Sequence, residues 1–264
     1  MKPVGFWSVR WILTTLLAIA GVGVLIRLGI WQLDRLAQRR VFNERVTAQL
    51  QASELDLTQN VDLGRQLYDM EYRSVVVRGE YDFSQEVLLR NQDYGGQLGF
   101  HVLTPLRIAN SDQSVLVDRG WIPFDQAAPE LRAQFQEPGQ VVVRGVIRRP
   151  QTHPDFGGVP DPTLAPGETR LDAWNIVNLD RIRLQVAEPL LPVYIVQGPD
   201  PSWSGVPVRQ MVMPEISEGP HMGYAMQWFT FAATLGLGYP FFVRKQLMRS
   251  TKLAENRVAG NESI

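Results

Sequence analysis

Few residues of this chain have side chains that could carry out chemistry. The 264 residues include three histidines, His101, His153 and His221, and no cysteine. The missing cysteine excludes disulfides, thiol nucleophiles, and thiolate ligands for zinc, copper or iron–sulfur clusters. No two histidines lie within four residues of each other, so the sequence has no local metal motif of the H-E-x-x-H kind.

The remaining patterns do not indicate catalysis either. Gly95–Gly99 is glycine-dense, but a strand-like run follows it, whereas a P-loop needs a helix and a lysine there. The segment therefore predicts a turn. No G-x-S-x-G nucleophile elbow occurs, and the carboxylates are scattered along the chain. We expect a protein that is not an enzyme and has no metal site formed by its own side chains.

His221 is the histidine whose position indicates a function. It lies at the start of residues 220–243, which carry no charged side chain. A histidine at the first turn of such a helix can ligate a haem iron through a ring nitrogen. The alternative is an ordinary polar residue at the membrane interface. The residues alone leave both interpretations open.

A second unusual segment is the sequence VDRGWIP at residues 117–123. One interpretation is a strand that ends in a bulge, with Trp121 packing over a barrel core. The other is a recognition edge in which Arg119 and Trp121 bind a protein partner, because arginine and tryptophan are enriched at binding hot spots.

Two uncharged stretches predict the elements that would position His221. Residues 11–33 contain only Arg27 as a charge, and Trp11 and Trp31 are 20 positions apart, about 30 Å of helix. We predict membrane spans at 11–33 and 220–243. A cleaved signal peptide is the alternative for the first, with a small-x-small site at 18–20, but the apolar run continues beyond that site. A buried hairpin of a soluble core is the alternative for the second.

Charge predicts the topology. Lys+Arg total 26 and Asp+Glu 27, which does not favour a nucleic-acid partner. Segments 1–10 and 244–264 are short and basic, so both are predicted to be cytoplasmic. Residues 34–219 hold 18 Arg, no Lys and 25 Asp+Glu, and form the predicted extracytoplasmic domain. Because no Arg/Ser-rich presequence precedes the first span, we expect a two-pass protein of a bacterial plasma (inner) membrane.

The central domain is predicted to be rich in β-strands. Short runs of β-branched and aromatic residues are separated by Gly, Asn, Asp or Pro, which favours an antiparallel barrel or sandwich with short helices. The predicted strands are 72–81, 86–90, 100–108, 114–121, 140–148 and 192–197. Residues 34–51 are good helix formers and are predicted to prolong the first span, while 178–187 predict a short amphipathic helix. The pentapeptide VVVRG occurs at both 75–79 and 141–145, which indicates two similar strands or chance.

Several segments together resemble the Surfeit locus protein one (Shy) family of cytochrome c oxidase assembly factors. They cover the chain from the first predicted span to the second. The matching segments are GIWQLDR at 29–35, YRSV at 72–75, LTPL at 103–106, VDRGWIP at 117–123, VRG at 143–145 with RRP at 148–150, WN at 174–175, and HMGYAMQWF at 221–229.

The resemblance implies a membrane-anchored helper for the haem–copper oxidase core subunit, acting in the respiratory chain where haem a is inserted. It implies that His221 is a haem a ligand, and we group Tyr224 and Trp228 of the same motif with it as cofactor-binding residues. It also implies the core subunit, the lipid bilayer and a haem a synthase as partners. One departure is that GPHM stands at 219–222 where the family often has Asn-x-His-Leu, which leaves the polar contacts of the histidine undefined.

Two other functions are compatible with the same sequence. One is a haem-free scaffold that binds the core subunit through the spans and the Arg119/Trp121 edge. The other is a membrane-tethered sensor. The 21 residues after Val243 are too few to form the output domain that a sensor needs.

Overall fold

The computed structural model describes residues 9–211 and 213–261. Its contacts divide the chain into two compact units. The first consists of the residues up to Glu44 together with those from Ile216 onward, and the second is Arg45–Glu215. Residues 1–8 of the predicted N-terminal segment and 262–264 of the predicted C-terminal tail lie outside the described residues.

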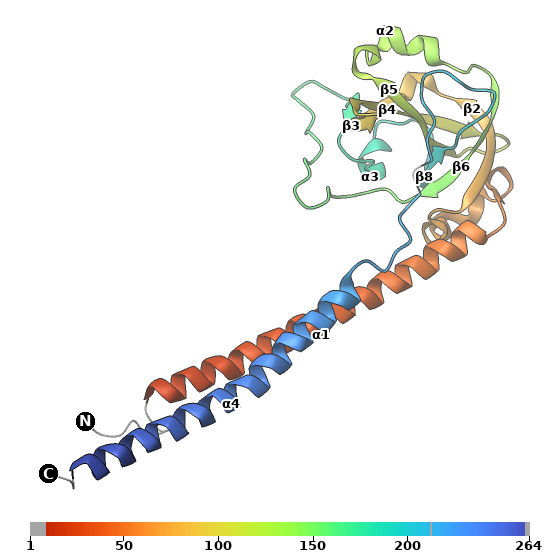
Figure 1. Cartoon of the computed structure of the whole chain (residues 1–264). Coiled ribbons are helices and arrows are strands. Elements are labelled where there is room, and N and C mark those ends of the chain that lie inside the picture. Colours follow the sequence, from red (N-terminus) through yellow and green to blue (C-terminus); the bar gives the residue numbers. More distant parts are fainter. Residues whose placement is uncertain (1–8, 212, 262–264) are drawn as a thin grey trace. The chain divides into compact units, whose positions relative to one another are not determined.

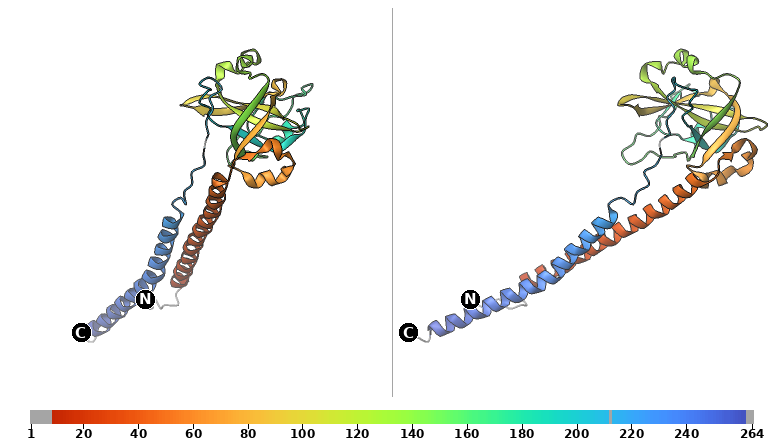
Figure 2. Two further views of the ribbon diagram at one scale, coloured as in Figure 1. Left: turned by 90° about the vertical axis from the view of Figure 1, so that its right-hand side faces the viewer. Right: turned by 45° about the vertical axis from the view of Figure 1, so that its right-hand side comes forward.

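The first unit is a pair of long helices, α1 (Val9–Gln51) and α4 (His221–Asn261), which run antiparallel along each other (Figures 1 and 2). The prediction that 34–51 prolongs the first helix is confirmed, since α1 is continuous over 43 residues. Leu, Ala, Gln, Arg and Glu dominate this part of the sequence, and all are good helix formers.

A regular seam of side chains joins the two helices. Part-buried and buried residues of α1 include a series with alternating spacings of four and three, which is the pattern of left-handed helix pairs. The series is Trp11, Thr15, Ala18, Val22, Leu25, Gly29 and Gln32. The facing residues of α4 keep the same spacing and are His221, Ala225, Trp228, Ala232, Leu235 and Tyr239. The first predicted span and the start of the second therefore pack through matching periods.

α1 is a candidate membrane span by its length and composition. Its most apolar 18-residue window is only 6% buried, whereas the core helix of a soluble protein would be mostly buried. Among the described helices, α1 alone is both long enough and apolar enough to cross a membrane. In α4 the apolar residues alternate with Gln227, Thr230, Thr234 and Pro240, so the second span at 220–243 stays a prediction.

The second unit is a β-barrel with short helices around it (Figure 1). Its strands are β1 (Leu55–Asp56), β2 (Ser74–Tyr81), β3 (Val87–Tyr94), β4 (Gln97–Ile108), β5 (Ser114–Pro123), β6 (Gln140–Arg148), β7 (Ala173–Trp174) and β8 (Leu190–Gln197). The helices are α2 (Pro129–Arg132), α3 (Leu179–Ile182) and the 3₁₀ turns Leu57–Gln59, Val61–Met70, Phe83–Gln85, Phe124–Gln126 and Ala133–Phe135. The six predicted strands are confirmed, and the predicted helix at 178–187 shortens to α3.

Five strands close the barrel in the order β2-β6-β8-β5-β4 and back to β2. The β5–β8 pairing is parallel, so the expectation of an antiparallel sheet is only partly correct. In chain order the third and fifth barrel strands form this parallel pair, which is the connectivity of the OB-fold. Valine, leucine and isoleucine from all five strands fill the interior. The fold by itself assigns no function.

The two VVVRG pentapeptides lie side by side and pair with each other. Val77 lies opposite Val143 at the centre of the antiparallel β2–β6 ladder, so each residue of one copy faces the mirror position of the other. A Cβ on Gly79 would lie 2.1 Å from the Arg107 carbonyl oxygen, and one on Gly145 2.1 Å from that of Val196. The missing side chain therefore allows a neighbouring strand to approach closely, β4 at Gly79 and β8 at Gly145.

Candidate functional site

His221 forms a hydrogen bond across the helix pair. Its Nδ1 atom is 2.8 Å from Oε1 of Gln32 on α1, a side chain that is 9% exposed. This bond therefore joins the first and the last of the segments that carry the family resemblance, GIWQLDR at 29–35 and HMGYAMQWF at 221–229.

The bond determines which nitrogen of His221 is available. The amide oxygen of Gln32 accepts, so Nδ1 carries the proton and Nε2 keeps its lone pair. Histidines that ligate a metal commonly donate their second ring N–H in this way, which fixes the ring orientation. His221 is thus prepared to act as a ligand through Nε2.

Gly219 lies beside the Nε2 edge of the His221 ring. Gly219 has φ +65°, and a Cβ there would lie 3.5 Å from Cδ2 and 3.6 Å from Nε2 of His221. A larger residue at this position would be strained by the positive φ, and its Cβ would contact this edge of the ring. Among the described residues no group of three or more His, Cys, Asp or Glu could hold a metal ion. A haem supplies its own four equatorial nitrogens, so a single protein imidazole fits this donor set.

Tyr224 and Trp228 follow His221 on the same helix by one and two turns. Tyr224 is 48% exposed, and Trp228 packs its ring edge-on against Phe231 at 6.1 Å. The structure thus places an exposed phenol and a half-buried indole within about 11 Å of helix from the histidine.

Close packing next to the His221–Gln32 bond depends on Gly29. A Cβ at this position would lie 2.6 Å from Cε1 and 2.7 Å from Cζ of Phe229. Any side chain on α1 at this point would push the ring of Phe229 away. Gly29 therefore lets Phe229 approach the backbone of α1 one turn from Gln32.

Polar contacts hold the segment before α4 against α1. The Ser217 carbonyl accepts hydrogen bonds from Arg39 Nε and Asn43 Nδ2, each at 3.1 Å. Arg40 and Glu218 form an exposed ion pair at 2.7 Å, which contributes little energy but fixes direction. Together these contacts align the first turn of α4 with Gln32.

Arg119 lies inside the barrel domain and is 0% exposed. It pairs with Glu86 at 3.1 Å and Glu137 at 3.2 Å, and donates to the Phe135 carbonyl. Its guanidinium also lies 5.0 Å from the ring centre of Tyr81. An arginine this deeply enclosed cannot contact a partner protein.

Trp121 is 5% exposed and fills the end of the same strand. Its Nε1 donates to the Gln92 carbonyl at 3.2 Å, and its ring packs on Tyr94 at 5.3 Å. Before it, Gly120 has φ +122°, and a Cβ there would lie 2.4 Å from the Val208 carbonyl oxygen. The structure therefore contradicts the interpretation of Arg119 and Trp121 as an exposed recognition edge and agrees with the packing interpretation.

Glu86 is the central acid of this polar core. Burial raises its pKa, although the charges of Arg119 and Arg132 and a hydrogen bond from Thr104 act in the opposite direction. Arg209 is buried as well and binds Glu137 at 2.6 Å. Buried networks of this kind stabilise one arrangement of the fold, because removing one charge leaves the others unpaired.

The other two histidines lie in the barrel domain. His101 Nδ1 is 2.7 Å from Oδ2 of the buried Asp118. Burial lowers the pKa of His101, but the charge and hydrogen bond of Asp118 outweigh it and raise the pKa above its ordinary value. His153 is exposed in a loop, next to Thr152 at 3.0 Å. Neither lies in the same unit as His221.

Sequence reasoning did not identify Gln32 and Gly29 as site residues. Gln32 is an amide within the uncharged run that follows Arg27, and a polar residue in such a stretch indicates a functional position. That signal was present, but its partner 189 residues away could only come from the structure.

These features define a class of protein: a barrel domain attached to an apolar helix that could span a membrane, with a histidine held by an amide across a helix pair. The model of the SURF1 family matches residues 19–233, and the chain belongs to this family.

Named relatives extend the comparison. The chain is 27% identical over 235 residues to Surfeit locus protein 1 of Xenopus tropicalis, covering 83% of this chain and 72% of that protein. It is 25% identical over 235 residues to Surfeit locus protein 1 of Takifugu rubripes, covering 83% and 92%. It is 26% identical over 239 residues to a SURF1-like protein of Drosophila melanogaster, covering 83% and 74%.

Proposed function

We propose that this chain is a membrane-anchored assembly factor for the haem–copper (cytochrome c) oxidase core subunit, and that it binds haem a through His221. Membership of the SURF1 family supports the assembly role. The observation that carries the haem proposal is the 2.8 Å bond from His221 Nδ1 to Gln32, which leaves Nε2 free beside Gly219.

In this proposal α4 is a second membrane span. Its outer surface exposes large apolar side chains that water would disfavour and lipid would accept, namely Met222, Met226, Phe231, Leu237, Phe241 and Phe242. Both basic ends of the chain are cytoplasmic and the barrel domain is extracytoplasmic, in a bacterial plasma membrane.

In this proposal His221 would hold the haem iron, Gln32 would orient the imidazole ring, and Tyr224 and Trp228 would offer aromatic surface to the porphyrin. The chain itself makes and breaks no covalent bond in this role. Haem a is cargo, received from the enzyme class that makes it, haem a synthase, and passed to the oxidase core subunit. A single protein ligand, His221, would suit such a transfer.

A haem-free scaffold is the second candidate, and the same bond supports it. A histidine and a glutamine that satisfy each other between two apolar helices form a clamp that needs no ligand. The scaffold would bind an assembly intermediate of the core subunit through the exposed faces of α1 and α4.

One experiment tests both candidates. The full-length protein is purified from cells that make haem a, its visible spectrum is recorded, and the measurement is repeated with His221→Ala. The haem proposal expects a haem a spectrum that His221→Ala loses while the core subunit still co-purifies. A wild-type protein that carries the core subunit and no haem would leave the scaffold. Full haem content in His221→Ala would remove the ligand assignment.

A further inference from the structure

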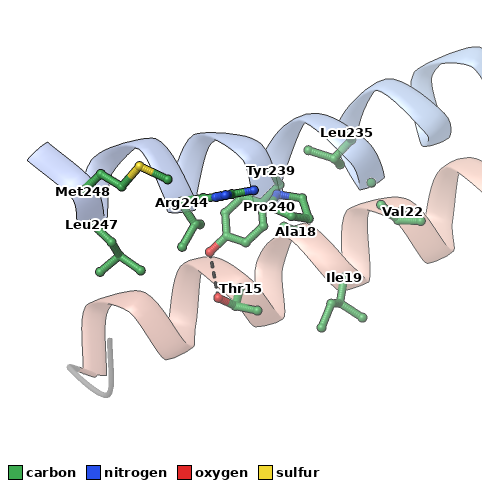
Figure 3. Close-up of a pocket in the computed structure, with 12 residues that line it drawn as sticks. Thr15, Ala18, Ile19, Val22, Leu235, Tyr239, Pro240, Arg244, Leu247 and Met248 are labelled. Atoms are coloured by element: carbon green, nitrogen blue, oxygen red, sulfur yellow. Dashed lines mark hydrogen bonds between the residues drawn. The ribbon is translucent and has the colours of Figure 1, made fainter. Parts of the chain in front are cut away.

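A groove of about 760 Å³ lies between α1 and α4, far from His221 (Figure 3). Ala18 and Val22 of α1 form one wall, and Leu235, Gly236 and Pro240 of α4 form the other. Tyr239 in the groove is 18 residues after His221, about 27 Å along the helix. The volume is within the range of small-molecule sites, roughly 300–1,000 Å³. This groove is therefore separate from the proposed haem site.

The groove offers an almost entirely apolar surface. The hydroxyl groups of Thr15 and Tyr239 share a hydrogen bond of 2.7 Å, drawn in Figure 3, and Thr15 also donates to the Trp11 carbonyl. Both hydroxyls are thus satisfied within the protein. Small side chains at Ala18 and Gly236 leave the space, and Pro240 interrupts the helix next to it. Such a surface suits a hydrocarbon chain.

One end of the groove is strongly basic. Arg244 lines the groove and also a second cavity of about 320 Å³ with Lys245, Arg249 and Lys252. All four cations are exposed. Residues 1–33 and 219–254 contain no Asp or Glu, and residues 244–264 hold five Arg and Lys against Glu255 and Glu262. This end of the helix pair therefore carries an excess of positive charge.

We propose that the groove binds one anionic phospholipid, with an acyl chain between α1 and α4 and its phosphate at Arg244 and Lys245. An apolar groove that ends in exposed cations matches a molecule with a hydrocarbon tail and a negative head. A zwitterionic lipid lacks the net charge, and a soluble anion lacks the chain. The proposal depends on the membrane insertion of α4 that belongs to the proposed function, because only then does the groove face lipid.

Native mass spectrometry of the full chain in neutral detergent tests this site. Dioleoyl phosphatidylglycerol and dioleoyl phosphatidylcholine are offered separately, and the retained lipid is counted. We expect one tightly held phosphatidylglycerol per chain. Arg244→Gln with Lys245→Gln weakens its binding roughly 30-fold, and Gly236→Leu, which fills the groove, removes it.

Two matched controls share the chemistry but not the site. Gly238→Leu adds the same side chain where an added Cβ meets nothing within 4 Å, and Arg35→Gln removes an exposed cation of α1 that lies 20 residues after Thr15. Both are expected to keep the lipid. The proposal is overturned if the two lipids are held equally, if Gly236→Leu binds like the wild type, or if Arg35→Gln weakens binding as much as Arg244→Gln with Lys245→Gln.

Failure of this site can be told apart from failure of the proposed function. The chain has no cysteine, so a single cysteine introduced at the outward-facing Phe231, which is 45% exposed, reports whether α4 lies in the membrane, through its protection from a water-soluble thiol reagent. Accessible Phe231→Cys overturns both proposals about α4. Protected Phe231→Cys without selective phosphatidylglycerol binding overturns the lipid site alone. His221→Ala is expected to lose haem and to keep the lipid.

Discussion

Replacing Gln32 with leucine is the sharpest test of the His221 site. Leucine replaces the amide with an apolar side chain of similar size between α1 and α4, so the packing is largely retained. It removes the oxygen that lies 2.8 Å from His221 Nδ1. The imidazole then loses the group that fixes its tautomer and its orientation, while Nε2 is still present. The substitution therefore tests the orientation of the His221 ring separately from the presence of the ring.

The expected size of the effect follows from two magnitudes. Removing the partner of a metal-ligating histidine typically weakens metal affinity about 10- to 100-fold, or about 1.4–2.8 kcal/mol. Hydrogen bonds between helices in a membrane contribute on average about 0.6 kcal/mol and at most about 1.7 kcal/mol. We therefore expect Gln32→Leu to reduce haem a affinity more than it reduces the stability of the helix pair.

The assay is a titration of the full-length protein in detergent with haem a, followed by its visible absorbance. His221→Ala defines the absence of the ligand. Gln38→Leu is the matched control, because the Gln38 amide accepts from Arg35 on the exposed side of α1. Wild-type affinity and an unshifted absorbance band in Gln32→Leu, together with loss of binding in His221→Ala, would refute the idea that Gln32 orients the ligand.

Three further predictions concern the barrel domain. Arg119→Met should lower the free energy of unfolding by about 3–5 kcal/mol, because the buried Glu86 loses the nearer of its two arginine partners, and urea unfolding measures this. Gly120→Ala should destabilise the domain by about 1–3 kcal/mol or more, since φ is +122° and the added Cβ collides with a carbonyl, as the melting temperature will show. The raised pKa of His101 means that its pairing stabilises the fold fully below about pH 6.5 and is lost as pH rises through the folded-state pKa. Asp118→Asn should flatten this decline in a series of melting temperatures between about pH 5 and 9.

Each of these predictions has a control on the same barrel. Arg144→Met removes an arginine whose side chain is 69% exposed, and equal destabilisation by both arginine variants would contradict the role of burial. Gly96→Ala imposes a positive φ with no neighbour within 4 Å, so it measures backbone strain without collision. His101→Gln should show the same flat pH profile as Asp118→Asn, and a profile like that of the wild type would exclude this pair as the source.

The strands were predictable because their signals are local. Runs such as Val75–Val77 favour extended backbone through their own side chains, and turn residues bound them. The two-residue strands β1 and β7 carry no such signal, since they exist only through pairing with β2 and β3. Closure of the barrel through Tyr81 and Leu106 is also a pairing between distant segments.

Site residues were predictable by type, and their partners were not. The sequence identifies His221 because it is a histidine at the start of an uncharged stretch. Arg119 is a candidate for a recognition edge from sequence because arginine is enriched at binding hot spots. Its burial depends on Glu86 and Glu137, neither of which lies near it in sequence. Residues so far apart in sequence come into contact only when the chain folds, so their pairing could not be predicted from local patterns.

The paired VVVRG segments have a consequence beyond one molecule. A sequence that pairs in antiparallel register with its own copy offers the same register to that copy in a second chain. The closed barrel uses these edges internally, but an unfolded chain leaves them free. We expect refolding at high protein concentration to yield strand-exchanged dimers, detectable by size-exclusion chromatography as dimers that persist on dilution. The repeat that pairs β2 with β6 is thus also the segment through which two chains can exchange strands.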